Sequence, residues 1–537
     1  MLLAIDVGTL SARAGLFALS GTLAATASAP FALRHLAGGH AVYRMAEIWA
    51  AVEAAIAAVL AACPDARHRL AGMAFDATSS LVLAHDGAPP LPDGADVFCW
   101  ADHSGEALTA EIEASGDLLL SHTGGTMSPE QHLPKLLGLA RRDPAAFARV
   151  TAARDLCDAL AFRATGADVR SLCGLACKWP YLPAEPDPWR RTLLERLGLG
   201  RLPALAGPPP RPVGSLHGRL LPALAARLGL PPGLPVAVGL IDAEAGTLGA
   251  LGPGFAAATN ATMALIGGTS TCIMTFASDR RLVPGVWGPF RDALFPDLWM
   301  HEAGQSLSGA ALDAVLERHP AGPRAATPEA HAAATTEVLR RLDAEGPAFA
   351  ARRHIVPDWL GNRSPLGDGG VRALSTGLGE ERDAPSFHEA YYATARALVL
   401  QARQIADHLD RHGYAIGRVA LSGGHARNPL LLRLYRDALG RGLLLPDSPE
   451  PVLLGTAMVA AVGAGGHPDL MTAMARMMPG QRLLPPDPAW RQAHEIAYAL
   501  YLRMFEARNA AHRCSAGLAA IPWPPAGDTG RSCRGRP

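Results

Sequence analysis

Two short Gly-Thr turns are the features of the sequence best suited to phosphate chemistry. Gly8-Thr9 follows the apolar run 2–7, and Gly268-Thr269 follows a similar run about half a chain later. Such a turn presents backbone N–H groups and a hydroxyl with no Cβ in the way, which suits phosphate oxygens. Asp6 precedes the first turn, and a carboxylate beside a triphosphate can hold hydrated Mg²⁺. A single Gly-Thr turn is typical of any hairpin, so only the pair makes nucleotide binding as well supported as a structural role.

Asp242 is the carboxylate best placed to act as a base. It ends the apolar run 235–241 and precedes small residues. A carboxylate at such a strand end can accept a proton from a hydroxyl that attacks a phosphoryl group. The same position suits a helix N-cap, so local sequence leaves both interpretations open.

Lys178 and Glu302 could bind hydroxyls and a carbonyl of a polar ligand, or could be solvated surface charges. Lys178 is one of only two lysines, since the other residues in the total of 49 Lys+Arg are arginines. A compact ammonium and a planar guanidinium are not interchangeable at a tight site, so a retained lysine points weakly to a specific contact.

Motifs for other cofactors are missing from the sequence. The 19 histidines form no H-E-x-x-H pattern, so we expect no zinc site. No G-x-x-x-x-G-K-[ST] loop and no G-x-G-x-x-G fingerprint occurs, which disfavours a Walker A nucleotide site and a dehydrogenase. Cys173 and Cys177 stand four apart, the other cysteines are isolated, and we interpret all of them as reduced thiols in the core.

Composition indicates an ordinary globular protein. The chain has 537 residues with 49 basic against 49 acidic side chains, so charge favours neither nucleic acid nor a membrane surface as a partner. The N-terminus lacks the basic region of a signal peptide, and the apolar stretches near 50–62 and 452–466 are too short, or carry Glu53, for a membrane span. We therefore expect a cytoplasmic protein.

The pattern of apolar residues predicts an α/β fold whose second half repeats the first. Three strands, at 2–7, 12–19 and 22–29, should form a meander that precedes a helix at 45–62. Residues 263–276 start the same pattern again.

Later elements are expected as a strand at 418–422 and helices at 429–439, 452–464 and 491–512. These patterns divide the chain into an N-terminal domain (1–250), a C-terminal domain (251–505) and a disordered tail (506–537).

Several segments together resemble the FGGY carbohydrate kinases, and most closely their ribulokinase-like pentulose kinases. The resemblance rests on motifs whose order and spacing cover roughly residues 2–465: Asp6-Val7-Gly8-Thr9, Phe75-Asp76-Ala77-Thr78, Trp100-x-Asp102-His103, Cys177-Lys178-Trp179, Gly239-x-Ile241-Asp242-Ala243, Gly268-Thr269-Ser270-Thr271-Cys272, Glu302-x-Gly304-Gln305-Ser306 and Ser422-Gly423-Gly424. It implies two ribonuclease H-like domains, of the actin/Hsp70/hexokinase-type ATPase fold, with a cleft between them.

The activity implied by the resemblance is ATP-dependent phosphorylation of a ketopentose at O5, with Mg²⁺ as the accompanying ion. D-ribulose is the first choice of sugar, followed by L-ribulose and then another ketose or polyol. Ser79 and Ser104 depart from residues that ribulokinase-like members often carry, which bears on the sugar and not on the catalytic frame.

The resemblance also implies a role for individual residues. Asp242 is the general base, and the sugar pocket comprises Ala77, Lys178, Asp242 and Glu302. ATP is bound by Thr9, Ser11, Arg13, Gly268, Thr269, Gly304, Gly424 and Asn428. Asp6 reaches Mg²⁺ through water.

One alternative of a different class keeps the fold without the chemistry, namely a nucleotide-operated sensor. It predicts ATP turnover that is indifferent to sugars. The expected partners are a small sugar and ATP, and whether the chain forms a homodimer is left open.

Overall fold

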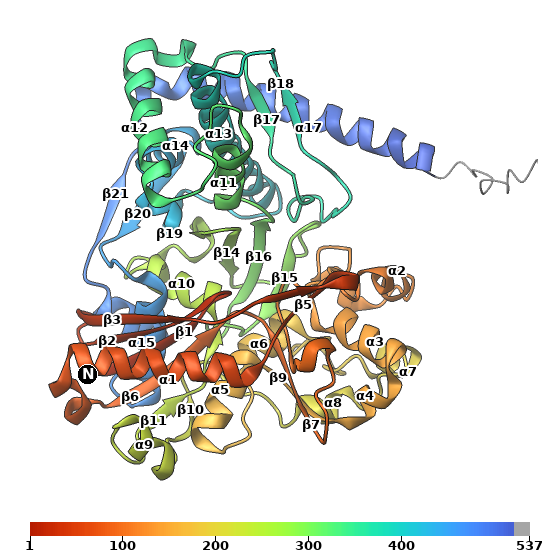
Figure 1. Cartoon of the computed structure of the whole chain (residues 1–537), viewed down its shortest axis with the longest axis vertical. Coiled ribbons are helices and arrows are strands. Elements are labelled where there is room, and N and C mark those ends of the chain that lie inside the picture. The colour runs from red at the N-terminus through yellow and green to blue at the C-terminus, as the bar shows by residue number, and fades with distance from the viewer. Residues whose placement is uncertain (520–537) are drawn as a thin grey trace, which may run out of the picture.

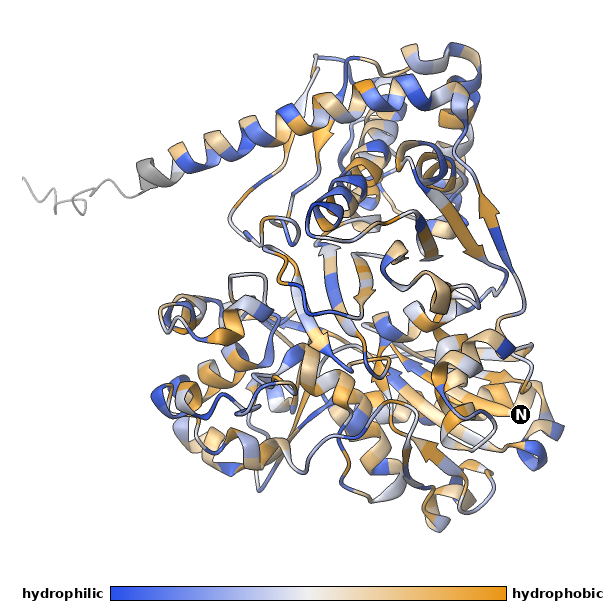
Figure 2. Ribbon diagram, turned by 180° about the vertical axis from the view of Figure 1, so that it is seen from behind, coloured by the Kyte–Doolittle hydropathy of each residue, from blue (hydrophilic) through white to orange (hydrophobic). Residues whose placement is uncertain are grey.

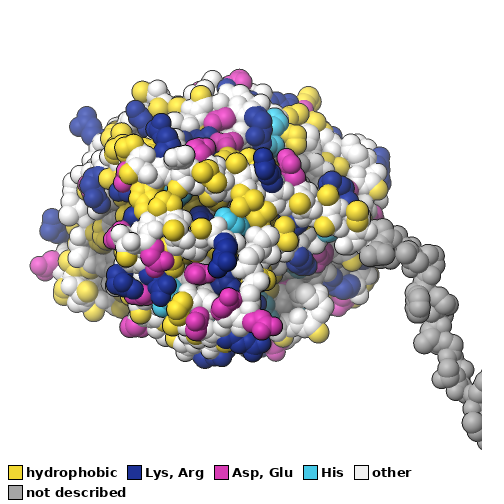
Figure 3. All heavy atoms as spheres, turned by 90° about the horizontal axis from the view of Figure 1, so that it is seen from above, with side chains coloured by type: hydrophobic (Ala, Val, Ile, Leu, Met, Phe, Trp, Pro, Cys, Tyr) yellow, Lys and Arg dark blue, Asp and Glu magenta, His cyan; other side chains and the backbone are white. Residues whose placement is uncertain are grey.

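Two seven-stranded mixed sheets form the centres of two lobes in the computed structural model, which describes residues 1–519 (Figure 1). The strands of both sheets are largely hydrophobic (Figure 2), and basic and acidic side chains are interspersed on the surface seen from above (Figure 3). Each lobe therefore has its own buried core, and the fold is the expected two-domain α/β architecture.

The N-terminal sheet opens with the expected meander. β1 (Leu2–Val7) pairs antiparallel with β2 (Ser11–Phe17), which pairs with β3 (Leu23–Pro30). On its other side β1 pairs in parallel with β6 (Gly72–Ala77). Every residue of β1 and β6 is buried, as is usual for central strands covered on both faces.

α1 (Met45–Ala62) packs one face on β2 and β3. Its 18 residues are long and apolar enough to cross a membrane by length and composition alone, so this stretch is longer than the sequence analysis assumed. Half of the helix is buried inside the protein, and a core helix passes the same test.

The C-terminal sheet repeats the same arrangement. β13 (Thr262–Gly267) pairs antiparallel with β14 (Thr271–Ala277) and in parallel with β19 (Arg418–Gly423). β16 (Trp299–Gln305) continues the sheet beside β14. The second hairpin of the sequence thus occupies the position in its sheet that β1–β2 has in the first.

The other elements extend or cover these two sheets, or form a separate five-stranded sheet (β4-β5-β8-β7-β9) and a separate two-stranded sheet (β17-β18). The remaining strands are β4 (Arg34–Leu36), β5 (His40–Tyr43), β7 (Leu81–His85), β8 (Val97–Phe98), β9 (Val150–Asp155), β10 (Leu216–Arg219), β11 (Pro235–Ala237), β12 (Leu240–Ile241), β15 (Trp287–Arg291), β17 (His354–Val356), β18 (Leu374–Thr376), β20 (Gly442–Pro446) and β21 (Gln481–Leu484). The remaining helices are α2 (Thr109–Glu113), α3 (His132–Arg142), α4 (Pro144–Arg149), α5 (Leu156–Thr165), α6 (Leu172–Lys178), α7 (Arg191–Arg196), α8 (Leu202–Ala206), α9 (Pro222–Leu228), α10 (Asp242–Leu251), α11 (Gly309–Arg318), α12 (Pro328–Glu345), α13 (Ala384–Arg411), α14 (Pro429–Ala438), α15 (Pro451–Gly463), α16 (Leu470–Met477) and α17 (Arg491–Ala519).

The terminal helix α17 is longer than expected. It continues to Ala519, past residue 506, at which we expected a disordered tail to begin. Figure 1 shows its last turns extending away from the body of the molecule. Residues 520–537, the rest of the expected tail, lie outside the described residues.

Two central helices join the lobes. α10 packs on β13 of the C-terminal sheet, α15 packs on β1 and β6 of the N-terminal sheet, and the two helices pack on each other. Their backbones are close: a Cβ added to Gly455 would lie 1.9 Å from the carbonyl oxygen of Ala245, and one added to Gly249 would lie 1.8 Å from that of Pro451. Glycine is needed at both positions because any side chain would separate the helices.

Gly455→Ala should therefore destabilise the protein by about 1–3 kcal/mol, the usual cost of overpacking a tight interior contact. The measurement is the thermal midpoint compared with wild type. Gly417→Ala is the matched control, since an added Cβ there meets no atom within 4 Å. Equal midpoints for the two variants would show that the helix crossing tolerates expansion.

Candidate active site

The register of the N-terminal sheet gathers charged side chains at one edge. Asp6 on β1 lies opposite Arg13 on β2 and opposite Asp76 on β6. β12 pairs with β6, and Asp242 follows as the first residue of α10. Adjacent strands that run in register thus bring three carboxyl groups and one guanidinium to the same strand ends.

In each Gly-Thr turn the glycine N–H donates to a carbonyl of the same turn, three residues further on in the first turn and two residues further on in the second. The Gly8 N–H donates to the Ser11 carbonyl at 3.0 Å, and the Gly268 N–H donates to the Ser270 carbonyl at 2.8 Å. We call these turns, Gly8-Thr9 and Gly268-Thr269, the N-terminal and C-terminal elbows.

Each elbow is held from outside. The start of α11 holds the C-terminal elbow, because the Gly309 N–H donates to the Gly268 carbonyl at 3.0 Å. At the N-terminal elbow, the Trp100 indole donates to the Thr9 hydroxyl at 3.1 Å and the Tyr43 hydroxyl donates to the Thr9 carbonyl at 2.9 Å. Both turns are therefore fixed in position before any ligand binds.

One cavity of about 240 Å³ lies between the elbows and contains most of the predicted site residues. The residues that the sequence analysis singled out and that line this cavity are Asp6, Gly8, Thr9, Arg13, Lys178, Asp242, Gly268, Thr269 and Glu302. The cavity is thus lined by residues from both halves of the chain: the two elbows, Lys178 with Glu302, and two members of the acidic strand edge, the name we give to Asp6, Asp76 and Asp242 at the strand ends of the N-terminal sheet.

Burial and neighbouring charges alter the carboxyl groups on the cavity floor. Burial, and then the nearby Asp6 charge, raise the pKa of Asp242 to about 7. The same two causes raise the pKa of the fully buried Asp76 well above its usual value, and Thr456 donates a hydrogen bond to Asp76. Arg13 offsets this charge, pairing with Asp6 and, at 2.9 Å, with Glu450.

Lys178 and Glu302 form a buried ion pair at 3.0 Å. The Lys178 ammonium also lies 4.5 Å from the centre of the Trp287 ring. Burial opposes the charged form of Lys178, but the acidic neighbours Glu302 and Glu244 outweigh it and raise the pKa of Lys178. These two side chains are charged groups in the cavity, not the solvated surface charges that local sequence also allowed.

Comparison with known proteins agrees with this geometry. The model of the N-terminal domain of the FGGY family of carbohydrate kinases matches residues 1–249, and the model of its C-terminal domain matches residues 263–464. The chain belongs to the FGGY family of carbohydrate kinases. It is therefore a sugar kinase, and the phosphate donor of such kinases is ATP.

Relatives of the kinase extend over nearly its whole length. An FGGY carbohydrate kinase domain-containing protein of Danio rerio is 34% identical over 94% of this chain and 96% of its own length. A D-ribulokinase of Saccharomyces cerevisiae is 30% identical over 86% of this chain and 71% of its own. A xylulose kinase structure from Brucella ovis has the same fold, with a TM-score of 0.80 at 22% identity over 95% of this chain and 99% of that one.

Five predicted site residues do not line the cavity of the kinase: Ser11, Ala77, Gly304, Gly424 and Asn428. The Ala77 side chain is 1% exposed in the apolar core, and the next two residues, Thr78 and Ser79, line the cavity in its place. The Ala77 side chain therefore does not reach the cavity, because β6 ends at Ala77 and the residues that enter the cavity follow the strand, and its role in the sugar pocket stays a prediction.

Two of these five residues, Gly304 and Asn428, have structural explanations. Gly304 is buried in β16, where an added Cβ would lie 2.5 Å from the Thr271 carbonyl oxygen. Asn428 caps α14, because its side-chain oxygen accepts from the N–H groups of Leu430 and Leu431. Gly424 directly follows β19 and is exposed. Their roles toward the nucleotide stay predictions.

Sequence reasoning missed an ion pair that closes one side of the cavity. Arg363, from the loop after β17, donates to both carboxylate oxygens of Glu130 at 2.9 and 3.0 Å. Burial works to raise the pKa of Glu130, but Arg363 and then Lys178 outweigh it and lower that pKa. Arg363 is one arginine among many in an aperiodic segment, so only proximity in space identifies it.

The Glu130–Arg363 pair connects the N-terminal half of the kinase to the C-terminal half. Arg363→Met should destabilise the protein by about 3 kcal/mol, because it leaves a partly buried carboxylate without its partner. Adding Glu130→Gln should recover part of that loss. The measurement is the urea midpoint of wild type, both single variants and the double variant.

Arg340→Met is the control for this cycle. Arg340 pairs with Glu337 on an exposed helix surface, so we expect no measurable change in the urea midpoint. If Glu130→Gln and Arg363→Met were additive, the two side chains would not be coupled across the lobes.

Proposed function

We propose that this kinase phosphorylates a ketopentose at its terminal 5-hydroxyl, with D-ribulose as the substrate and D-ribulose 5-phosphate as the product. The observation that carries the proposal is the position of Asp242 in one cavity with both elbows and with the Lys178–Glu302 pair. The choice of sugar is supported by the similarity to the yeast D-ribulokinase and to a ribulokinase of Mycolicibacterium smegmatis, which is 29% identical over 81% of this chain.

Asp242 is the general base in this proposal. Its carboxyl faces the cavity and has a pKa of about 7, close to the pH at which a base is both ionised and able to take a proton. As the sugar hydroxyl attacks the terminal phosphoryl group of ATP, its proton moves to a carboxylate oxygen of Asp242. Phosphoryl transfer needs little covalent help, so positioning and charge neutralisation supply most of the rate.

The elbows supply the phosphate-binding groups. Thr9 on one lobe and Gly268 with Thr269 on the other line the cavity from opposite sides, and Arg13 adds a guanidinium. The N–H groups of Gly8 and Gly268 are bonded within their turns, so the donors for an anion are those of Thr9, Thr269 and the residues after them, beside glycines that carry no side chain. A polyphosphate bound there would contact both lobes at once.

The acidic strand edge fits Mg²⁺. Three carboxyl groups converge near Asp6, Arg13 is paired with only one oxygen of Asp6, and hard carboxylate oxygens are the ligands that Mg²⁺ prefers. Asp6 would hold the ion through water. The ion would neutralise phosphate charge during transfer.

Sugar recognition is assigned to the polar wall that faces Asp242. Lys178 offers up to three N–H donors, and Glu302 and Glu130 offer carboxylate acceptors. Arg363 orients Glu130 by its two hydrogen bonds. A polyhydroxylated ligand suits this wall because each hydroxyl can donate and accept.

The direct test of activity is ADP release measured with D-ribulose, L-ribulose, D-xylulose, tetruloses and polyols. We expect sugar-dependent turnover that is highest with D-ribulose. Asp242→Asn should lower kcat by a factor on the order of 10² or more, the size of a general-base contribution. Asp297→Asn, at a side chain that is 93% exposed, is the matched control and should retain full activity. ADP release that no sugar increases would favour a nucleotide-operated sensor.

The metal assignment is tested by the Mg²⁺ dependence of the rate. EDTA should abolish turnover, and Asp6→Asn should raise the Mg²⁺ concentration for half-maximal rate by about tenfold, as expected for a residue that holds the ion through water. Glu450→Gln removes the other partner of Arg13 without changing Asp6, and its Mg²⁺ requirement should match wild type. A similar shift in both variants would assign the effect to Arg13.

A further inference from the structure

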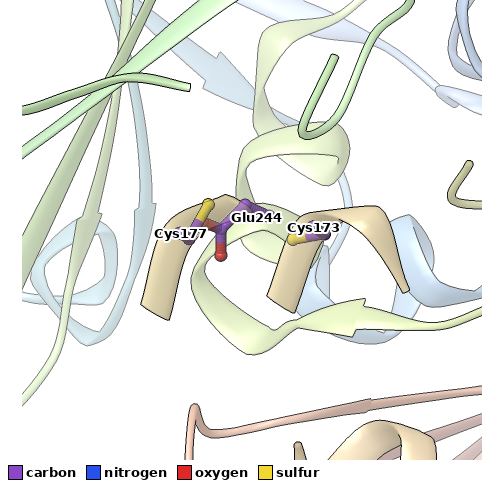
Figure 4. A group of neighbouring side chains, drawn as sticks. All are labelled: Cys173, Cys177 and Glu244. Carbon is purple, nitrogen blue, oxygen red and sulfur yellow. The ribbon is translucent and has the colours of Figure 1, made fainter. Parts of the chain in front are cut away.

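A compact group of two thiols and one carboxyl lies behind the cavity wall. Cys173 and Cys177 stand one helical turn apart on α6, and Glu244 extends toward them from the first turn of α10 (Figure 4). One ligand atom from each residue lies within 4.8 Å of the other two. None of the three residues lines the cavity assigned to ATP and sugar.

Glu244 is the member of this group that needs an explanation. It is fully buried, and neither carboxylate oxygen has a hydrogen-bond partner among the described residues. Burying such a group without a partner costs several kcal/mol in either protonation state, since a neutral carboxyl still needs an acceptor for its proton. The thiols beside it are weak donors and satisfy it poorly.

We propose that Cys173, Cys177 and Glu244 bind a borderline or soft divalent cation, with Zn²⁺ as the expected ion, contrary to the expectation from the sequence, since Glu244 joins the two thiols only in the folded structure. Thiolate sulfur and carboxylate oxygen are both zinc ligands, and two sulfurs disfavour Mg²⁺ or Ca²⁺. The ion satisfies the carboxylate that the protein leaves unpaired. Water completes the coordination.

The geometry requires only a small contraction. Zinc–sulfur bonds of about 2.3 Å in a tetrahedron place two sulfurs about 3.8 Å apart. The ligand atoms already lie within 4.8 Å of one another, so the two sulfurs need to approach by at most about 1 Å, which side-chain rotation can provide. Burial raises the pKa of Cys177 well above its usual value, and metal coordination reverses this by stabilising the thiolate directly.

The position of this site gives it a structural role. Cys177 is adjacent to Lys178, and Glu244 lies two residues after Asp242. An ion shared by α6 and α10 ties together the two helices that supply a sugar-binding lysine and the catalytic carboxylate. The site is therefore a clamp behind the active site, and its test does not depend on which sugar is phosphorylated.

The first experiment measures metal content. The full-length protein is produced without a histidine tag and with Cys514→Ser, because this exposed thiol could bind zinc by itself. After dialysis under reducing conditions, elemental analysis should find about one zinc per chain. Cys177→Ala and Glu244→Gln should reduce this value roughly tenfold, whereas Cys157→Ala, matched in burial but outside the group, should not.

The second experiment covers the case in which a variant misfolds or zinc is lost during purification. The protein is unfolded in reducing guanidinium and refolded with Co²⁺, which reports thiolate ligands by a charge-transfer absorption. We expect this absorption in wild type and in Cys157→Ala, together with a higher thermal midpoint than for protein refolded with a chelator. The proposal is overturned if wild type retains no zinc and shows no cobalt–thiolate absorption, or if Cys177→Ala retains both.

Discussion

The close crossing of α10 and α15 is the constraint on which the site depends. Each helix packs on the sheet of one lobe, so their contact sets how the two sheets face each other. α10 begins with Asp242. α15 carries Thr456, which donates a hydrogen bond to Asp76, the neighbour of Asp6 in the sheet. Glycines at the crossing let the backbones approach, and a wider spacing would move the base away from the elbow of the opposite lobe.

Charge balance is the second requirement of this arrangement. Bringing like-charged carboxyl groups together in a buried place is unfavourable, and it raises the pKa values of Asp76 and Asp242. Arg13 offsets the strand edge, while Lys178 and Arg363 each pair with a glutamate on the opposite wall. The unfavourable carboxyl cluster persists because its chemistry is useful: it yields a base near neutral pH beside a position suited to a cation.

Sequence patterns predicted the parts of the site that lie within regular elements. Asp242 follows from an apolar run that ends at a carboxylate, Asp6 from its place just before a Gly-Thr turn, and the elbows from Gly-Thr at strand ends. The role of Ala77 stays a prediction: its side chain is buried while Thr78 and Ser79 line the cavity, and deciding which of three adjacent residues faces a cavity requires the exact end of the strand. Arg363 could not be predicted at all, since its contact with Glu130 spans 233 positions and depends on how the lobes pack.

The chain has two lysines, Lys135 and Lys178, and the structure gives each of them a specific contact. Both are buried, but only Lys178 lines the cavity. Lys135 donates to the carbonyls of Cys99 and Trp100 at 2.9 and 2.8 Å, and the indole of Trp100 in turn donates to Thr9. The compact ammonium of this fully buried side chain donates to two neighbouring carbonyls, a geometry that the rigid fork of a guanidinium does not reproduce. The ammonium of Lys178 is thus a binding group in the cavity, and the ammonium of Lys135 supports the N-terminal elbow through Trp100. We expect that arginine could replace neither lysine.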